Sequence, residues 1–409
     1  MLEKRVVFLL EEYLPESTKS HAKMIHALAK KFAREGHSTV ALVPSNGSQQ
    51  TLLEMSIMDD VEVWRYRAPM AKGGSRLRRA LLELLLPYHA LFALFFSSQS
   101  KNLKFDICVN YSPTIFLAPL AFFFKKKGAF VYLVLRDFFP GWLVDRGILK
   151  ERSLATYFFK IFEQFNYSIS DAIGVQSPNN IPIFEKIYRG QKKAHVLMNW
   201  GEKKEESEKF DDRLQIRNLL GLTENQILLI YGGNMGPAQD MENILHLITS
   251  MQTYKEAHFL LFGEGEHFVK VKSYFDKEIG GNASLKPSVS QDEFERYLSA
   301  ADVGIVSLSA MHLSHNIPGK VLSYLANDLP ILGCVNAGND LITIVNNREV
   351  GFISVSGDNL SLVEGATRLL NDEDLRKDYS LNCKNLLQEL FSVDAAYKEI
   401  SERYLAGKF

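Results

Sequence analysis

The hydrophobic pattern of the first half alternates between short apolar runs and longer segments with helical periodicity. Apolar runs predict β-strands at 5–10, 39–43, 61–67, 106–110, 130–135, 172–176 and 195–199. Segments with an apolar face predict helices between them at 20–35, about 76–100, 114–126, 153–169 and 179–188. Continuous apolar strands that alternate with helices are typical of a parallel sheet covered on both faces.

The second half repeats this alternation. Strands are predicted at 226–232, 257–262, 283–286, 302–307, 330–335 and 351–355, with helices between them and a final helix that contains Tyr397 and Tyr404. The charged stretch 201–212 has no apolar periodicity and is the best candidate for an interdomain linker. The predicted fold class is therefore α/β, with two doubly wound parallel-sheet domains separated by a cleft.

Length and charge narrow the possibilities. With 409 residues the chain is too long for one typical core, and its net charge of −1 argues against nucleic-acid binding. Residues 1–198 hold 27 Lys and Arg against 17 Asp and Glu, and residues 199–409 hold 20 against 31. The first half therefore carries +10 and the second −11, so we expect the first half to meet an anionic surface.

The cysteines and the N-terminus indicate a cellular compartment. Cys108, Cys334 and Cys383 are far apart, show no metal-ligand spacing, and fit buried thiols in a reducing cytosol. The apolar run at 6–10 is too short for a signal peptide and is predicted as a strand instead. We therefore expect a cytoplasmic protein.

The segment from His315 to Leu332 predicts a helix followed by a strand. Pro318 is placed to open the first helical turn, and Gly319 leaves its backbone N–H groups accessible. Lys320 adds an ammonium group beside those N–H groups, an arrangement that binds phosphate at helix N-termini. The alternative is an ordinary buried helix with a solvated lysine, and this segment alone does not decide between the two.

Two glycine turns follow predicted strands in the second half. One is I-Y-G-G-N-M-G at 230–236 and the other is F-G-E-G at 262–265. Neither has the spacing of a dinucleotide fingerprint or a P-loop, and each alone is compatible with a plain tight turn. Together with the turn at 318–320, they predict a cleft for a nucleoside diphosphate at the carboxyl edge of the sheet.

Polar residues also follow predicted strands in the first half. His21 lies in the loop or first helical turn after the first strand, where a structural or capping role is the alternative. Arg136 and Asp137 directly follow the apolar strand 130–135, at the edge where α/β sheets bind ligands. A buried Arg–Asp pair that stabilises the turn is an equally good interpretation.

The first half also mixes apolar, aromatic and basic residues. Arg76, Arg78 and Arg79 precede A-L-L-E-L-L-L-P-Y-H-A-L-F-A-L-F-F, and the lysines at 125–127 follow L-A-P-L-A-F-F-F. Neither apolar run is long enough to span a bilayer. They predict helices that lie in the interface of an anionic membrane, with core helices of a large domain as the alternative.

Taken together, these motifs resemble the glycosyltransferases of GT-B fold, and among them family 4. The resemblance covers nearly the whole chain and rests on Gly36-His37, Asn199, the turn at Gly233, F-G-E-G, A-A-D-V-G-I-V-S-L at 300–308 and I-P-G-K-V-L-S-Y-L-A-N-D-L-P-I-L at 317–332. The variants L-R-D-F-F-P-G-W and H-N-I-P-G-K look like a subgroup of bacterial surface-polysaccharide enzymes. We associate that subgroup with N-acetyl-L-fucosamine transfer in O-antigen assembly.

This resemblance implies two Rossmann-like domains facing across a cleft: 1–198 for the acceptor and membrane, and 199–388 for a nucleotide-sugar donor. A terminal helix at 389–409 would cross back to the first domain. The implied donor-binding residues are Gly233, Asn234, Gln239, Gly263, Glu264, Gly265, His315, Pro318, Gly319, Lys320 and Ser323. Arg136 and Asp137 fall where many members carry a catalytic histidine and its neighbour, and His21 completes the predicted catalytic set. The donor is expected to be UDP-linked, without a metal or other cofactor.

The chain departs from the family pattern at four positions. The usual Arg and Lys after the glycine turn are Asn234 and Gln239, and the usual glutamates eight positions apart are His315 and Ser323. These changes remove the expected carboxylate contact with the ribose. They also leave more of the diphosphate charge to Lys320 and Arg136.

The sequence thus predicts a cytoplasmic enzyme on the inner face of the cytoplasmic membrane. It would move a sugar from a UDP donor to a lipid-linked glycan in O-antigen or other surface-polysaccharide assembly. One alternative is a non-catalytic GT-B subunit, favoured by the missing glutamates and disfavoured by Lys320 and the glycine turns. Another is a nucleotide-sugar 2-epimerase of the same fold, disfavoured by the acidic turn E-E-Y-L-P-E-S-T after the first strand.

Overall fold

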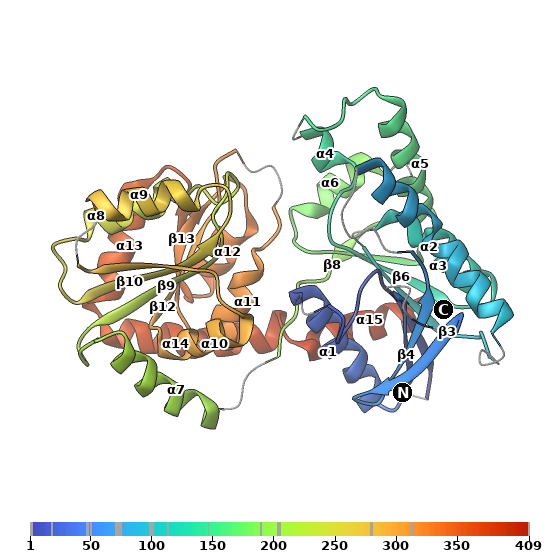
Figure 1. Cartoon of the computed structure of the whole chain (residues 1–409), viewed down its shortest axis with the longest axis horizontal. Coiled ribbons are helices and arrows are strands. Elements are labelled where there is room, and N and C mark those ends of the chain that lie inside the picture. Colours follow the sequence, from blue (N-terminus) through green and yellow to red (C-terminus); the bar gives the residue numbers. More distant parts are fainter. Residues whose placement is uncertain are drawn as a thin grey trace. The chain divides into compact units, whose positions relative to one another are not determined.

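The chain folds into two units, each built on one sheet covered by helices (Figure 1). The computed structural model describes residues 3–17, 19–45, 49, 51–69, 76–97, 102–112, 114–145, 147–188, 190–202, 206–278, 281–311 and 315–407. Unit 1 comprises Met1–Met198 with Val393–Phe409, and unit 2 comprises Asn199–Ser392. The predicted fold class, two Rossmann-like α/β domains, is confirmed.

The sheet of unit 1 has the strand order β3-β4-β2-β1-β5-β6-β7-β8. Its strands are β1 (Arg5–Leu9), β2 (Ser38–Ser45), β3 (Leu53–Met58), β4 (Val61–Arg67), β5 (Ile107–Tyr111), β6 (Phe130–Leu135), β7 (Ala172–Val175) and β8 (His195–Val196). All neighbours are parallel except β3 and β4. The order reverses between β1 and β5, a point where open α/β sheets form a ligand-binding crevice.

The helices of unit 1 explain why its strands are apolar throughout. They are α1 (Ser20–Arg34), α2 (Arg76–Phe96), η1 (Ile115–Leu117), α3 (Ala118–Lys126), α4 (Gly141–Asp145), α5 (Leu154–Ile169), α6 (Asn180–Ile187) and α15 (Val393–Ala406). Val7 and Leu9 of β1 join the core formed with α2 and α3. Phe8, between them, packs edge-to-face on Phe32 of α1. Adjacent residues of one strand are therefore buried on opposite faces of the sheet.

The C-terminal helix α15 belongs to unit 1. Tyr397 lies 4.8 Å from Phe32 between ring centroids, and Tyr404 lies 5.7 Å from Phe130. The unit boundary falls after Ser392, whereas the sequence placed it at 388/389, because α14 continues to Leu390 before the chain turns.

The sheet of unit 2 is parallel throughout, in the order β11-β10-β9-β12-β13-β14. Its strands are β9 (Ile227–Asn234), β10 (Ala257–Glu264), β11 (Ala283–Pro287), β12 (Val303–Ser307), β13 (Ile331–Val335) and β14 (Gly351–Val355). Its helices are α7 (Glu206–Leu219), α8 (Met241–Ser250), α9 (Phe268–Glu278), α10 (Gln291–Ala300), α11 (Gly319–Ala326), α12 (Asp340–Asn347), α13 (Asn359–Asn371) and α14 (Glu373–Leu390). The order reverses between β9 and β12, which places a second crevice there.

Several sequence-based boundaries were wrong. The stretch 201–212 is not simply a linker, because α7 begins at Glu206 and is held through Arg213 and Arg217, whose guanidinium groups lie 2.6 and 3.1 Å from the Asp302 carboxylate. The last strand of unit 1 ends at Val196 rather than at residue 199. Strand β3 was missed because only Leu53 among its residues is buried, so the strand lacks a continuous apolar run.

Helix α5 buries an acidic side chain. Glu163 is 3% exposed and accepts a 3.0 Å hydrogen bond from the Tyr167 hydroxyl, and burial raises the pKa of its carboxyl to about 7. An acid whose pKa is raised on folding keeps its proton up to a higher pH in the native state than in the unfolded state. Stability is therefore expected to fall as the pH rises from about 4.5 to about 7 and to stay low above that range.

Glu163→Gln is expected to stabilise the protein by at most about 3 kcal/mol at pH 8 and by little at pH 4.5. The glutamine keeps the acceptor oxygen for Tyr167 and has no charge to bury. Urea unfolding of both proteins at the two pH values measures the effect. An equal change at both values would show that the carboxyl is not protonated in the native state at low pH.

Candidate functional site

The two glycine turns of unit 2 lie side by side at the carboxyl edge of its sheet. Strands β9 and β10 pair in a register that places Gly263 opposite Gly233 and Glu264 opposite Asn234. A Cβ on Gly263 would lie 2.7 Å from the Gly233 carbonyl oxygen, and Gly233 has a φ of 129°. Both positions therefore require glycine, the first for space and the second for backbone conformation.

Polar side chains next to the glycine turns form hydrogen bonds at this edge of the sheet. The Asn234 Nδ2 donates a 2.9 Å hydrogen bond to Gln239 Oε1, so these two predicted donor-binding residues hold each other. Gly265 has a φ of 122°, and a Cβ there would lie 2.4 Å from Asn234 Oδ1. Glu264 Oε2 accepts a 2.9 Å hydrogen bond from Ser288, which holds this carboxylate against the end of β11.

Lys320 reaches the same edge from α11. Pro318 is the N-cap rather than the first helical residue, because its ψ of 136° is extended and the helix begins at Gly319. The Lys320 Nζ lies 3.6 Å from the centroid of the Tyr231 ring, and a Cβ on Gly233 would be 3.6 Å from it. The buried Nζ forms no hydrogen bond within the described part of the chain.

The surroundings of Lys320 explain its electrostatics. Burial lowers the pKa of its amino group to about 7. The ring of Tyr231 offers only a weak attraction to a cation, far less than a carboxylate or phosphate would. A buried amine that has no hydrogen-bonded anion among the described residues, next to a helix N-terminus, is arranged to receive an anionic ligand.

His315 and Ser323, the other two predicted donor-binding positions, make no hydrogen bond to this group of residues within the described part of the chain. The Nδ1 of His315 is also buried without a hydrogen-bond partner in the described structure, and its Cε1 lies 3.4 Å from the Cβ position built on Gly338, beyond β13. Ser323 lies on α11, one turn after Lys320, and its backbone oxygen accepts a hydrogen bond from Asn327. Among described residues, neither side chain bonds to Lys320 or to the glycine turns.

In unit 1, the predicted catalytic residues lie at the carboxyl edge where β1 and β5 meet. The His21 Nε2 lies 2.8 Å from a Glu12 carboxylate oxygen, and its ring stacks on Tyr111 with centroids 6.4 Å apart. The Arg136 guanidinium lies 5.9 Å from the Tyr111 ring centroid on the β6 side. Asp137 follows directly and contributes to raising the pKa of Tyr111, although burial is the larger cause.

The protonation of His21 follows from this arrangement. Burial lowers the pKa of its imidazole, and the neighbouring Glu12 carboxylate opposes but does not cancel that shift. Partial burial opposes ionisation of Glu12, but the hydrogen bond that it accepts from Lys19 and the nearby His21 outweigh that effect, and the pKa of Glu12 is lowered. The imidazole is therefore neutral at pH 7. The carboxylate beside Nε2 favours the tautomer with the proton there, which leaves Nδ1 able to accept a proton.

Sequence analysis missed three residues of these sites: Glu12, Tyr111 and Tyr231. Glu12 and Tyr111 belong to different strand ends that only the strand order brings together. Tyr231 stands directly before the glycine turn, and its aromatic ring in an otherwise aliphatic strand was an available signal.

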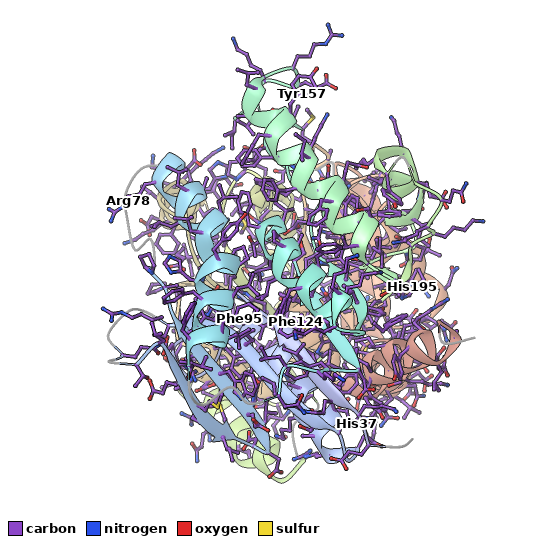
Figure 2. All side chains as sticks on the ribbon, turned by 90° about the vertical axis from the view of Figure 1, so that its right-hand side faces the viewer. His37, Arg78, Phe95, Phe124, Tyr157 and His195 are labelled. Atoms are coloured by element: carbon purple, nitrogen blue, oxygen red, sulfur yellow. The ribbon has the colours of Figure 1, made fainter. Side chains whose placement is uncertain are left out.

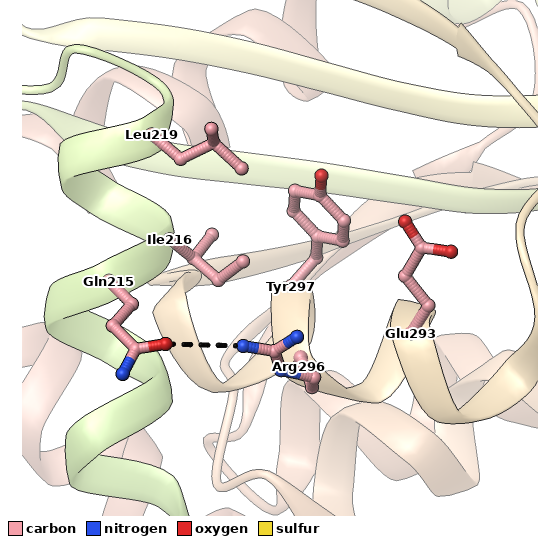
Figure 3. A pocket seen from close by; sticks show the side chains of 6 residues that line it. All are labelled: Gln215, Ile216, Leu219, Glu293, Arg296 and Tyr297. Carbon is pink, nitrogen blue, oxygen red and sulfur yellow. Dashed lines mark hydrogen bonds between the residues drawn. The ribbon is translucent and has the colours of Figure 1, made fainter.

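A separate hollow of about 300 Å³ lies between α7 and α10 (Figure 3). It is lined by Gln215, Ile216, Leu219, Glu293, Arg296 and Tyr297. The Arg296 guanidinium donates a 3.3 Å hydrogen bond to Gln215 across it. The hollow shares no residue with the glycine turns or Lys320, so the predicted donor site does not include it.

Known proteins share the sequence pattern of this chain. Residues 212–386 match the family model described as Glycosyl transferases group 1. The chain is 23% identical over 358 residues to the probable glycosyltransferase WbjE of Pseudomonas aeruginosa, covering 87% of each protein. It is 23% identical over 299 residues to the putative colanic acid biosynthesis glycosyl transferase WcaI of Escherichia coli K12, covering 71% of this chain and 69% of WcaI.

The fold is also shared with a solved structure. Anabaena Alr3699/HepE, crystallised in complex with UDP and glucose, superimposes with a TM-score of 0.66. The alignment covers 99% of this chain and 100% of HepE at 13% identity. At that identity the likeness concerns the fold.

Proposed function

We propose that this chain is a group 1 glycosyltransferase that transfers a sugar from a UDP-linked donor to a lipid-linked glycan in surface-polysaccharide assembly; the match of residues 212–386 to the group 1 family model and the similarity to WbjE support it. The observation that carries the proposal is the buried Nζ of Lys320, which has no hydrogen-bond partner among the described residues and lies beside Gly233 and the N-terminus of α11. This group of residues needs an anion, and the diphosphate of a nucleotide sugar supplies one.

The chemistry of unit 2 follows from charge. As the bond between the anomeric carbon and the diphosphate breaks, negative charge develops on the leaving oxygens. Lys320 and the first N–H groups of α11 would stabilise that charge, since they are fixed before the reaction begins. Asn234 and Gln239 would contribute neutral hydrogen bonds in place of cationic ones. Transfer in this proposal is metal-independent, because Lys320 and the helix N-terminus supply the positive charge.

The identity of the donor rests on the relatives. The HepE structure contains UDP and glucose, which supports a uridine nucleotide for this fold. WcaI is named for colanic acid biosynthesis, which supports a polysaccharide product. Within this proposal N-acetyl-L-fucosamine is the donor sugar. His315, which replaces a carboxylate of the family pattern, would donate to the sugar or ribose rather than accept from it.

Unit 1 would receive the acceptor. His21 would accept the proton of the attacking hydroxyl at Nδ1, while Glu12 holds the ring from the other nitrogen. Arg136 would attract the anionic part of a lipid-linked acceptor, and Asp137 would orient its hydroxyl. Removal of the proton as the new bond forms lowers the barrier of the transfer step.

We further propose that the enzyme is cytoplasmic and peripheral on the inner face of the membrane. Helix α2 exposes Leu81, Leu85, Tyr88, Phe92, Phe95 and Phe96. Lys126 at the end of α3 and Lys127 directly after it lie over Phe122 and Phe123, and Phe123 packs on Phe95. Lys125 does not belong to this lipid-facing group, because it is bound to Asp171 and the Ile169 carbonyl. The side chains of Arg76 and Arg79 lie outside the described residues, whereas Arg78 is exposed. No helix within the described ranges is both long and apolar enough to cross a bilayer.

Nucleotide binding tests the donor half of the proposal. UDP near 100 times its dissociation constant is expected to raise the melting temperature by about 5–10 °C, more than GDP or TDP does. Lys320→Ala is expected to abolish the shift, whereas Lys270→Ala, on the exposed α9, is expected to retain it. A UDP shift that survives in Lys320→Ala would place the nucleotide elsewhere. Binding without transfer to any lipid-linked acceptor would favour a non-catalytic subunit.

A further inference from the structure

Helix α5 is apolar on nearly all sides over its first half. Its sequence from Leu154 to Phe162 reads L-A-T-Y-F-F-K-I-F, and Phe159 and Phe162 pack on Phe116 of η1. The side facing away from the unit is also apolar: Leu154 is 90% exposed, Ile161 67%, Tyr157 56% and Phe158 41%. A helix that is hydrophobic all round is normally buried, in a core or in lipid.

The buried side of α5 carries polar residues. Thr156, Glu163 and Asn166 are each at most 3% exposed, and Asn166 accepts a hydrogen bond from Asn110 of β5. The helix thus buries polar groups while leaving large apolar ones in contact with water. Figure 2 shows Tyr157 near the end of α5 that extends past α2 and α3. The outward apolar side therefore needs an external partner.

Charges around this surface identify the partner. Lys150, Arg152 and Lys160 are exposed near the apolar side chains in the sequence, and between residues 147 and 162 the only acidic side chain is Glu151. Long basic side chains at the rim of an apolar helix contact anionic headgroups while their aliphatic stems and the aromatic rings sit at the acyl boundary. We propose that the first half of α5, from Leu154 to Ile161, inserts into the interface of an anionic lipid bilayer.

This contact would place the bilayer beside the acceptor residues. Helix α5 follows β6 and returns toward the amino edge of the sheet, so its first turn lies at the carboxyl edge that carries His21, Arg136 and Asp137. A lipid-linked acceptor could then stay in the membrane while its sugar reaches those residues. The inference rests on the proposed acceptor but is tested without any transfer.

Co-sedimentation with lipid vesicles tests the inference. Wild-type protein is expected to bind vesicles of phosphatidylcholine that contain phosphatidylglycerol and to bind pure phosphatidylcholine less. Tyr157→Asp with Ile161→Asp is expected to weaken binding about tenfold or more. The matched control is Val269→Asp with Leu381→Asp on α9 and α14, at positions that are 77% and 59% exposed. It introduces the same charge and is expected to bind as wild type does.

Several results would overturn the inference. They are an absence of vesicle binding by wild type, equal loss in both double variants, or a wild-type dimer that the α5 variant abolishes. Because the substituted side chains are exposed, the α5 variant should keep the wild-type melting temperature and its shift with UDP. A wild type that binds vesicles but shows no UDP shift would contradict the proposed function and leave this inference intact.

Discussion

Lys320→Met is expected to reduce transfer about 10²–10³-fold and, at the same time, to stabilise the free protein at neutral pH. The loss follows because the methionine removes the one cation that the described structure brings to the glycine turns of unit 2. Steady-state release of UDP from the donor, with and without acceptor, measures it. Lys286→Met is the matched control. Lys286 also lies over a tyrosine ring, 5.1 Å from Tyr297, but on β11.

The stability of Lys320→Met gives an independent readout. In wild type, the folded pKa of about 7 lies below the ordinary value of 10.5, so the unfolded state binds more protons between those values. The free energy of unfolding of wild type therefore rises with pH across this window. Below pH 7 the native state carries the full cost of burying the charged amine. The variant lacks that penalty, which is at most about 5 kcal/mol. It should be more stable than wild type at pH 6 and similar to it near pH 10.5. Equal stability of the two proteins at pH 6 would mean that Lys320 finds an anion within the free protein.

His21→Asn is expected to lower kcat/KM about 10²–10⁴-fold, because asparagine has no group that accepts a proton from the acceptor hydroxyl. In wild type, the acid limb of the pH profile should lie below the ordinary pKa of 6.5, since burial lowers the pKa of this imidazole. The profile of kcat/KM between pH 4 and 9, for wild type and variant, is the measurement.

The variant Glu12→Gln, measured in the same pH profile, distinguishes a catalytic role of the Glu12–His21 pair from a structural one. The carboxylate raises the pKa of His21, so its removal should move the acid limb to still lower pH. A merely structural role for the pair would change the melting temperature without moving the limb. If His21→Asn keeps the wild-type acid limb, another group accepts the proton, and Asp137 becomes the next candidate.

Local sequence patterns were sufficient to predict most of the two sheets. The apolar runs of β5, β6, β9 and β12 are buried on both faces, so each gives a clear signal within five to eight residues. Strand β3 gave none, since it pairs at the sheet edge and its exposed residues Glu54, Ser56 and Ile57 follow no regular alternation. Helix α7 begins in a charged stretch and depends on the distant Asp302, which no local pattern reveals.

The candidate sites, like the sheets, were predicted where local sequence defines them and missed where they depend on long-range contacts. The turns at Gly233 and Gly263 and the helix start at Lys320 were predicted from the sequence. That these turns pair in register was not, because it depends on the order of β9 and β10. Tyr231 beneath Lys320 and Glu12 beside His21 depend on long-range contacts. Helix α5 was predicted as a helix, but its composition shows only that it is apolar and not that its outer side stays exposed.

The measurement that tests the central claim most directly is a calorimetric titration of UDP into wild type and Lys320→Met at pH 8, repeated in two buffers of different ionisation enthalpy. The free amine is mostly neutral at this pH, and a bound diphosphate would stabilise its charged form. We therefore predict that wild type binds UDP with uptake of up to about one proton and that the variant shows no detectable binding. UDP binding of equal affinity in both proteins, without proton uptake, would contradict the assignment of Lys320 to the donor diphosphate.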